Sequence, residues 1–288
     1  MAMTATQGTA GQSMVGRSLG DRLILAAIIA LVIVWIVPIA WIAGLSFKPN
    51  SELMASTGTL FRAPYTLKNY TDILASSGVF RWILNSVVVA LGQTVGVLVL
   101  ASLAGYGFAR TQFPGRGVLF ALVLIGLAVP EQAVIIARFQ TFNDLKLHNS
   151  YLGLILPHLS APFGVFLMTQ YFKAIPRELD EAAMLDNASR FKTFWRVLLP
   201  LTVPAQATLG IFTFLAAWND YLWPLISATK PEMFTLTVGL ASTQTNFAQS
   251  EGLGFLMAQS VFAGLPVLIV YLFFQKYIVT AVAGAAIR

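Results

Sequence analysis

The sequence predicts an all-α membrane protein with six transmembrane helices, and two observations lead to this fold class. Hydrophobic residues make up 57% of the 288-residue chain and charged residues only 10%, whereas soluble domains carry about 25% charged residues; the mean hydropathy is +0.75. In addition, charge-free runs recur at lengths close to the roughly 20 residues that a helix needs to cross a bilayer. Cysteine is absent, which excludes a disulfide framework and thiol chemistry.

The six predicted spans follow from these runs in chain order. The first run is longer than the roughly 7–15 apolar residues of a cleavable signal peptide, so we expect it to remain as an anchor. The third run continues past Glu131, an acid that lies near one end of its span. The predicted spans are 23–47, 82–109, 117–137, 149–172, 197–219 and 252–275.

The spans divide the chain into four parts. Lysine and arginine are more frequent in the connections that would be cytoplasmic if both termini lay inside, so the positive-inside rule predicts cytoplasmic termini. The pI of about 9.7 then reflects topology, and no basic patch indicates a nucleic-acid partner. The predicted parts are a disordered cytoplasmic tail (1–22), the first helix with an external loop (23–81), a core of five helices with a cytoplasmic loop at 173–200 (82–278), and a cytoplasmic C-terminal tail (279–288).

One cytoplasmic connection, RELDEAAMLDNASRFK at 177–192, is far more charged than the rest of the chain. A charged side chain costs about 2.5–3.5 kcal/mol at the bilayer centre, so this stretch lies outside the membrane. Pro176 and the acids that follow it are favourable in the first turn of a helix. Asp186-Asn187 is predicted to end that helix, because asparagine tolerates the left-handed backbone conformation, and Ser189 to cap a second helix.

The first of these two helices has the features of a docking element. Its small residues, Ala182 and Ala183, would let a partner approach the backbone closely, and its acids would pair with basic groups. The second helix carries an apolar stripe from Phe191 to Leu199 and would lie at the lipid headgroups before it enters the membrane. A solvated loop that only connects two spans is the alternative.

These residues resemble the EAA loop in the permease subunits of ABC importers. Asn187 stands where the family has glycine, and asparagine is the next-best residue for a positive φ. The resemblance extends over nearly the whole chain from about residue 25, toward carbohydrate permeases of the MalG type. The matching stretches are Glu181-Ala182-Ala183, Asp186-Asn187-Ala188 and Leu199-Pro200, together with SFKPN at 46–50, YGFARTQFPGR at 106–116, LGLILP at 152–157 and WNDYLWPL at 218–225.

The resemblance implies a type I ABC importer permease fold in the cytoplasmic (inner) membrane of a bacterium or archaeon. The chain would form half of the translocation path for a sugar or oligosaccharide delivered by a solute-binding protein, beside a second permease subunit and surrounded by membrane lipid. Two cytoplasmic ATPase subunits would bind ATP and Mg²⁺. This chain has no G-x-x-x-x-G-K-[ST] motif, so we expect it to be neither an enzyme nor the holder of a cofactor. The residues that would couple to the ATPase are Glu178, Asp180, Glu181, Ala182, Ala183, Asp186, Asn187 and Arg190.

The connection 220–251, on the opposite side of the membrane, is long and largely polar, with Leu236, Val238 and Leu240 alternating. In the family that the chain resembles, this region meets the binding protein. A cap that folds back over the helices is the alternative. The residues expected to contact the binding protein are Thr243, Gln244, Thr245, Asn246 and Phe247.

Polar residues inside the predicted spans are sparse and are candidates for a substrate path. For each of them helix packing is the favoured alternative, and Gly92-x-x-x-Gly96 is a spacing that lets helices approach closely. The two histidines, His148 and His158, predict no metal site. The candidate path residues are Gln93, Tyr106, Glu131, Gln132, Asn219 and Gln259.

Two other classes of function stay open at this point. An ion-coupled secondary transporter needs buried titratable groups or broken helices at the midplane, and Glu131 is the only acid inside a predicted span. A membrane-embedded enzyme needs clustered histidine, aspartate or cysteine, and the sequence offers no such cluster. Within the importer class, a glycerol-phosphate-type or other polyol substrate is the alternative to a sugar. No lysine or arginine is predicted deep in a span, which favours a neutral sugar.

Overall fold

The computed structural model describes residues 19–49, 64–76, 78–243 and 252–286, with side chains up to residue 275, and every regular element in these ranges is a helix. Within them, three helices are long and apolar enough to cross a membrane, and three bent pairs of shorter helices would each do so if a pair counts as one span. The long helices are α1 (Leu19–Ser46), α4 (Val79–Arg110) and α15 (Gly252–Ala286).

The bent pairs correspond to the third, fourth and fifth predicted spans. Their halves meet at 97°, 51° and 76°, respectively. The first pair consists of α5 (Arg116–Gly126), η1 (Glu131–Val134) and α6 (Ile135–Asp144), the second of α7 (Tyr151–Ile155), η2 (Leu156–His158) and α8 (Pro162–Ala174), and the third of α10 (Arg190–Thr193), η3 (Phe194–Leu198), α11 (Leu199–Leu201) and α12 (Val203–Asn219).

Prolines explain where these spans break. Pro130 precedes η1, Pro162 opens α8 and Pro204 lies in the first turn of α12. Proline cannot donate a backbone hydrogen bond and disfavours helix for the residue before it, so a helix ends there and a new one begins. The prediction of six spans therefore holds when each bent pair counts once. The third, fourth and fifth spans are each broken rather than continuous, however, and the helices of the fifth begin at Arg190 rather than at 197.

Helix α4 is the centre of the bundle and packs against both α8 and α12. Two glycines of α4 let other helices approach closely, Gly92 toward α7 and Gly105 toward α8. A Cβ atom added at Gly92 would lie 2.6 Å from Ile155 Cδ1, and one added at Gly105 would lie 2.6 Å from Met168 Cβ. The structure thus confirms that Gly92 belongs to a close helix contact, as its spacing from Gly96 predicted.

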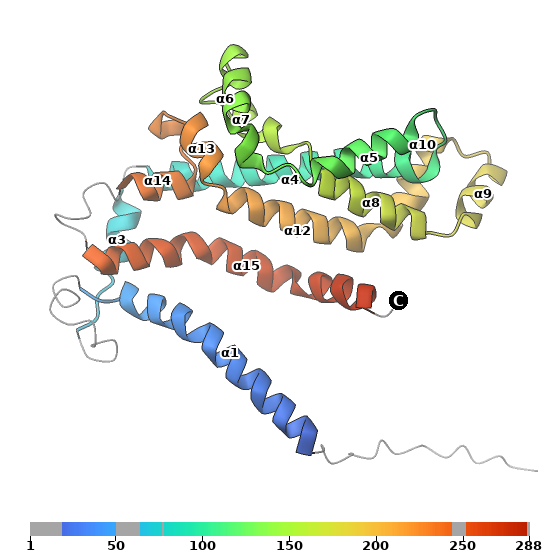
Figure 1. The fold of residues 1–288 in the computed structure, drawn as a ribbon. Coiled ribbons are helices and arrows are strands. Elements are labelled where there is room, and N and C mark those ends of the chain that lie inside the picture. Colours follow the sequence, from blue (N-terminus) through green and yellow to red (C-terminus); the bar gives the residue numbers. More distant parts are fainter. Residues whose placement is uncertain (1–18, 50–63, 77, 244–251, 287–288) are drawn as a thin grey trace, which may run out of the picture.

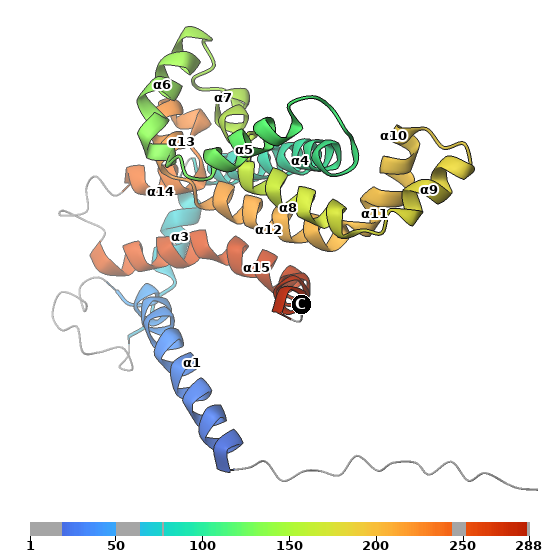
Figure 2. The ribbon, with the colours of Figure 1, turned by 45° about the vertical axis from the view of Figure 1, so that its right-hand side comes forward.

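The two ends of the bundle carry different parts of the chain (Figures 1 and 2). Helix α9 (Glu178–Leu185) and α10 lie at one end, and α3 (Lys68–Ala75) and α14 (Leu236–Ser242) lie at the other. Helix α1 reaches the α3 end with its C-terminus, where the Asn69 side-chain amide donates to the Ser46 carbonyl at 2.8 Å. The far end of α15 points toward the α9 end.

Residues 220–243, which we call the outer segment, fold back onto the start of α4. They contain α13 (Leu222–Ser227), η4 (Pro231–Met233) and α14. Trp82 Nε1 donates to the Pro231 carbonyl at 3.1 Å, and Asn85 Nδ2 donates to the Phe234 carbonyl at 2.8 Å. The described residues of this connection therefore form a cap that folds back over the helices, which is the alternative interpretation given above.

Candidate functional site

A cavity of about 800 Å³ lies between α4, α8 and α12, next to the breaks in the spans. Its wall combines charged and amide groups with two phenylalanine side chains. Such a mixture offers hydrogen bonds to hydroxyl groups together with apolar faces, which is how small polar ligands are bound. The wall includes Gln93, Glu131, Arg138, His158, Phe163, Phe212, Thr213 and Asp220.

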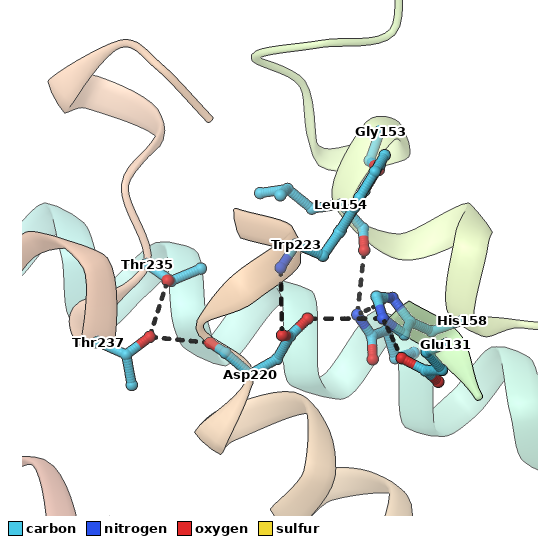
Figure 3. Close-up of polar contacts among 9 residues, drawn as sticks. Glu131, Gly153, Leu154, His158, Asp220, Trp223, Thr235 and Thr237 are labelled. Atoms are coloured by element: carbon cyan, nitrogen blue, oxygen red, sulfur yellow. Dashed lines mark hydrogen bonds and ion pairs between the residues drawn. The ribbon is translucent and has the colours of Figure 1, made fainter. Parts of the chain in front are cut away.

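Three charged or titratable side chains of this wall meet at His158 (Figure 3). His158 Nε2 lies 3.5 Å from Asp220 Oδ2 and 3.9 Å from Glu131 Oε2. The imidazole and the Asp220 carboxyl are largely buried, with 14% and 21% of their side chains exposed, whereas the Glu131 side chain is 67% exposed. His158 ends η2 and Glu131 begins η1, so two of the breaks bring their chain ends to this point, and Asp220 follows the last residue of α12.

Helix α4 sets the orientation of the imidazole through Gln93. Gln93 Nε2 donates to the Leu154 carbonyl at 3.0 Å and lies 3.2 Å from His158 Nδ1. Because Nε2 is the amide donor, Nδ1 of the imidazole is the acceptor. The proton of a neutral imidazole then sits on Nε2, which faces Asp220 and Glu131.

The outer segment holds the Asp220 side of the cluster. The Trp223 backbone N–H donates to Asp220 Oδ1 at 3.4 Å, and Thr237 Oγ1 donates to the Asp220 carbonyl at 2.9 Å (Figure 3). Burial raises the pKa of the Asp220 carboxyl above its ordinary value, and His158 opposes this rise only in part. The guanidinium of Arg138 lies 5.5 Å from the centre of the Trp223 ring, in a cation–π contact.

The structure brings only part of the predicted substrate path together. Gln93 and Glu131 line the cavity, whereas the other four candidates do not. The Tyr106 hydroxyl donates to the Arg190 carbonyl at the α9 end of the bundle, and Gln259 Nε2 donates to Thr243 Oγ1 at the opposite end. Asn219 donates to the carbonyl one turn earlier on α12, and Gln132 is exposed outside the cavity wall.

Three charged or titratable residues of the cavity wall were not among the predicted path residues, namely Arg138, His158 and Asp220. Arg138 lies one residue beyond the predicted span 117–137, so the expectation that no lysine or arginine lies deep in a span is unaffected, although a guanidinium does line the cavity. Two of the three had a signal in the sequence. His158 comes four residues before Pro162, and Asp220 directly follows a predicted span, so each lies at a break or end where backbone groups and side chains can reach an interior cavity.

The charged loop has the local structure that its sequence predicts. Helix α9 carries three acids in its first turn and ends before Asn187, whose φ of 52° is in the left-handed region. The Ser189 side chain accepts a hydrogen bond from the Lys192 backbone N–H at 3.3 Å and so caps α10. The prediction of two short helices joined by a turn is confirmed for this loop.

The predicted coupling residues divide into two groups by exposure. Ala183 is buried, and Asp180 turns inward to an ion pair with Arg110, whose Nη1 lies 3.4 Å from Asp180 Oδ2. The single small-residue face expected for Ala182 and Ala183 is therefore split, with Ala182 outside and Ala183 inside. The exposed group is Glu178, Glu181, Ala182, Asp186, Asn187 and Arg190.

Of the residues expected to meet a binding protein, Thr243 is the one described. Its hydroxyl donates to the Leu240 carbonyl at 2.7 Å. Residues 244–247 lie outside the described residues, so that expectation stays a prediction. Among the described residues, no group of three or more His, Cys, Asp or Glu side chains is placed to hold a metal ion.

Known proteins are similar to this chain in sequence and in fold. Residues 97–284 match the family described as "Binding-protein-dependent transport system inner membrane component". The arabinooligosaccharides transport system permease protein AraQ of Bacillus subtilis is 38% identical over 84% of this chain and 87% of its own length. The diacetylchitobiose uptake system permease protein NgcG of Streptomyces coelicolor is 32% identical over 93% of this chain and 90% of its own.

A solved structure agrees with the fold. A chain of a bacterial ABC transporter involved in the import of the acidic polysaccharide alginate superposes with a TM-score of 0.80, at 23% identity, over 90% of this chain and 98% of that chain. The sequence match covers more than half of the chain, and the fold match covers 90% of it. The chain therefore belongs to the family of binding-protein-dependent transport system inner membrane components.

Proposed function

We propose that this chain forms half of the translocation path of an ABC importer for a neutral sugar or oligosaccharide. The observation that carries the proposal is the cavity at the span breaks, where Gln93, Glu131, His158 and Asp220 meet between the two ends of the bundle. Hydroxyl groups of a sugar both donate and accept hydrogen bonds, and carboxylate, amide and imidazole groups satisfy both needs. A second permease subunit would supply the other wall of the path.

Relatives of known substrate support the sugar class. AraQ is named for arabinooligosaccharides and NgcG for diacetylchitobiose, and both are uncharged sugars. A substrate of the glycerol-phosphate type is the second candidate, and Arg138 in the cavity wall is the observation that favours it. Two carboxylates stand against that one guanidinium, so an anion would meet net repulsion in this half of the path.

The ATPase would dock at α9. The exposed acids Glu178 and Glu181 of α9, together with the exposed Ala182, form a surface that a cytoplasmic ATPase subunit would contact. The importer would contain two such subunits with bound ATP and Mg²⁺, one beneath this chain and one beneath its partner permease. The exposed position of Leu185, 85% accessible at the end of α9, also suits a docking surface.

The orientation follows from the same assignment. With α9 in the cytoplasm both termini would be cytoplasmic as well, and this is supported by the start of α1 and the far end of α15, which lie toward the α9 side (Figure 1). The outer segment and α3 would then face the binding protein. The excess of lysine and arginine in the cytoplasmic connections supports this arrangement.

Uptake by the reconstituted complex tests the proposal. The chain is purified with the subunits that accompany it and placed in liposomes, and entry of labelled arabinotriose, diacetylchitobiose and glycerophosphodiesters is measured with the binding protein outside. We expect uptake of a neutral sugar that needs hydrolysable ATP inside and is insensitive to ionophores. Uptake that follows a proton or sodium gradient and ignores ATP would contradict the importer, and selective uptake of the phosphodiester would contradict the substrate class.

A further inference from the structure

Arg110, the last residue of α4, is attached to the loop that contains α9. Its side chain is 5% exposed, and its Nη1 lies 3.4 Å from Asp180 Oδ2, whose side chain is 16% exposed. Arg110 Nη2 also donates to the Ile175 carbonyl at 2.5 Å, at the C-terminus of α8. One guanidinium therefore connects the end of α4 with the end of α8 and the first turn of α9.

A second contact from the same face of α4 reaches the other half of the loop. Tyr106 lies one turn before Arg110, so both side chains project from one side of the helix. The Tyr106 ring packs 5.0 Å from the Phe194 ring, and its hydroxyl donates to the Arg190 carbonyl at 3.3 Å. Helix α4 thus holds α9 through Arg110 and α10 through Tyr106.

The Arg110–Asp180 pair is better suited to fixing geometry than to adding stability. A buried ion pair loses the hydration of both charges, and well-packed apolar side chains often stabilise a site as well or better. Arg110 Nε has no hydrogen-bond partner within the described part of the chain, so the guanidinium is not fully compensated. Asp180 Oδ2 likewise has no hydrogen-bond partner there, so the contact is a single ion pair. Its remaining effect is to hold the first turn of α9 close to the end of α4, because separating the two buried charges would leave each without its partner.

The opposite end of α4 is held by polar contacts as well. This helix has 32 residues, which corresponds to about 48 Å at 1.5 Å per residue. Near its middle Gln93 contacts His158 in the cavity, and near its start the Asn85 amide donates to the Glu232 and Phe234 carbonyls. The Ser86 hydroxyl accepts from the Leu236 backbone N–H at 2.8 Å. One continuous helix therefore links α9, the cavity and the outer segment.

We propose that Arg110 and Asp180 are positioning residues that make α9 and α4 move as one body, so that a displacement of α9 reaches the cavity and the outer segment along α4. This inference rests on the proposed function, in which an ATPase subunit moves α9. It adds a named connection within this chain: the movement passes through the Arg110–Asp180 pair into α4, in addition to the covalent route from α10 into α12.

Distances between spin labels in the complex with its ATPase subunits test the connection. The chain has no native cysteine, so labels are placed at Arg177→Cys, at the N-cap of α9, and at Phe80→Cys, which is 68% exposed at the start of α4. A second pair, Arg177→Cys with Val34→Cys on α1, reports whether α9 moves at all. Both pairs are measured without nucleotide and after trapping with Mg-ATP and vanadate.

In the parent chain we expect the α9–α1 distance to change on trapping, while the α9–α4 distance changes by less than about 2 Å, the scale of small interface shifts. In Arg110→Gln and in Asp180→Asn the α9–α4 distance should change as well, and its distribution should widen. The charge swap Arg110→Asp with Asp180→Arg should restore the narrow distribution. Lys192→Gln, which removes an exposed charge from the same loop, is the matched control and should behave as the parent.

Three results would overturn the inference. The first is an α9–α4 distance in both single variants that stays as constant as in the parent. The second is a parent chain in which trapping changes the α9–α4 distance as much as the α9–α1 distance, or changes neither distance. The third is loss of the ATPase from both single variants without rescue by the charge swap, which would assign the pair to the folding of α9. A parent chain that never co-purifies with an ATPase would contradict the proposed function instead.

Discussion

His158 Nε2 lies 3.5 Å from Asp220 Oδ2, which joins the break in one bent span to the end of another. The contact places a hydrogen-bonding centre in the interior of the bundle without a charged residue in the middle of a helix. Because the chain is interrupted at these points, backbone groups at the helix ends need other partners, and the Leu154 carbonyl has one in Gln93 Nε2 at 3.0 Å. The breaks in the spans therefore allow the polar cluster to form inside the bundle.

The His158–Asp220 contact should appear in the stability of the protein. His158→Leu leaves a buried carboxyl without its partner, so we expect the free energy of unfolding to fall by about 1–3 kcal/mol. Removing both partners, in His158→Leu with Asp220→Leu, should cost less than the two single changes together. Thermal unfolding of the four proteins in detergent measures this, and strictly additive losses would show that the two side chains are not coupled. His148→Leu, outside the cavity wall, is a control for the loss of an imidazole.

Close packing along α4 predicts a sharp difference between two glycines of the same helix. At Gly105 an added Cβ would lie 2.6 Å from Met168 Cβ and 2.9 Å from backbone atoms, whereas at Gly107 nothing lies within 4 Å. We expect Gly105→Ala to destabilise the protein by about 1–3 kcal/mol through overpacking. Gly107→Ala should be neutral or stabilising by up to about 1 kcal/mol, because alanine favours helix over glycine. Equal melting temperatures for the two variants would contradict the packing of α4 against α8.

The turn between α9 and α10 depends on the left-handed conformation of Asn187, whose φ is 52°. Glycine adopts this conformation without strain, so Asn187→Gly should leave assembly with the ATPase unchanged. Valine is β-branched and resists it, so Asn187→Val should reduce co-purification of the ATPase about tenfold, equivalent to roughly 1.4 kcal/mol of strain. Wild-type assembly by the valine variant would mean that the turn is not needed for docking.

The division of the coupling residues by exposure changes what substitutions at the alanine pair should do. Ala182→Trp, on the exposed side, should block the ATPase while the permease stays folded, and Glu181→Lys should do so by charge reversal. Ala183 is 7% exposed, so Ala183→Trp should instead disturb the packing of α9 itself. Co-purification of the ATPase and the melting temperature of the permease separate the two effects. Asp72→Lys, on exposed α3 at the other end, is the control for a reversed charge.

If Ala182→Trp and Glu181→Lys both retain the ATPase and coupled transport, α9 is a connector and the docking assignment fails. A lower melting temperature for Ala182→Trp than for Ala183→Trp would contradict the exposures on which the design rests.

The sequence predicted features that depend on neighbouring residues. The acidic start of α9, the turn at Asn187 and the cap at Ser189 are each determined within a few residues, and all three are present. The breaks at Pro130, Pro162 and Pro204 also have a local cause, because proline removes a backbone donor and favours a break, although α1 and α15 continue through Pro38 and Pro266. Each apolar run was predicted as one continuous helix, so the bends at these prolines were not predicted.

Features that depend on distant partners were not readable in this way. Asp180 has the pattern of an exposed helix-start acid, and only the fold brings Arg110 to it. His158, Glu131 and Asp220 come from three different spans, and nothing in their spacing along the chain indicates that they meet. For Gln93 the alternatives were helix packing and substrate contact; its amide bonds the Leu154 carbonyl and the residue also lines the cavity, while contact with a substrate stays a prediction.

We propose that the cavity beside His158 is the translocation path and opens alternately to the two sides of the membrane. Thr213 lines this cavity, and a single cysteine there is the only thiol in the chain, since the chain contains none of its own. The most direct test is labelling of Thr213→Cys by a membrane-impermeant thiol reagent, applied from one side at a time, with and without Mg-ATP and vanadate. We expect position 213 to be labelled from one side without nucleotide and from the other side when the nucleotide is trapped. Leu103→Cys, outside the cavity wall, should show no such change. Labelling of position 213 from the same side in both states would contradict it.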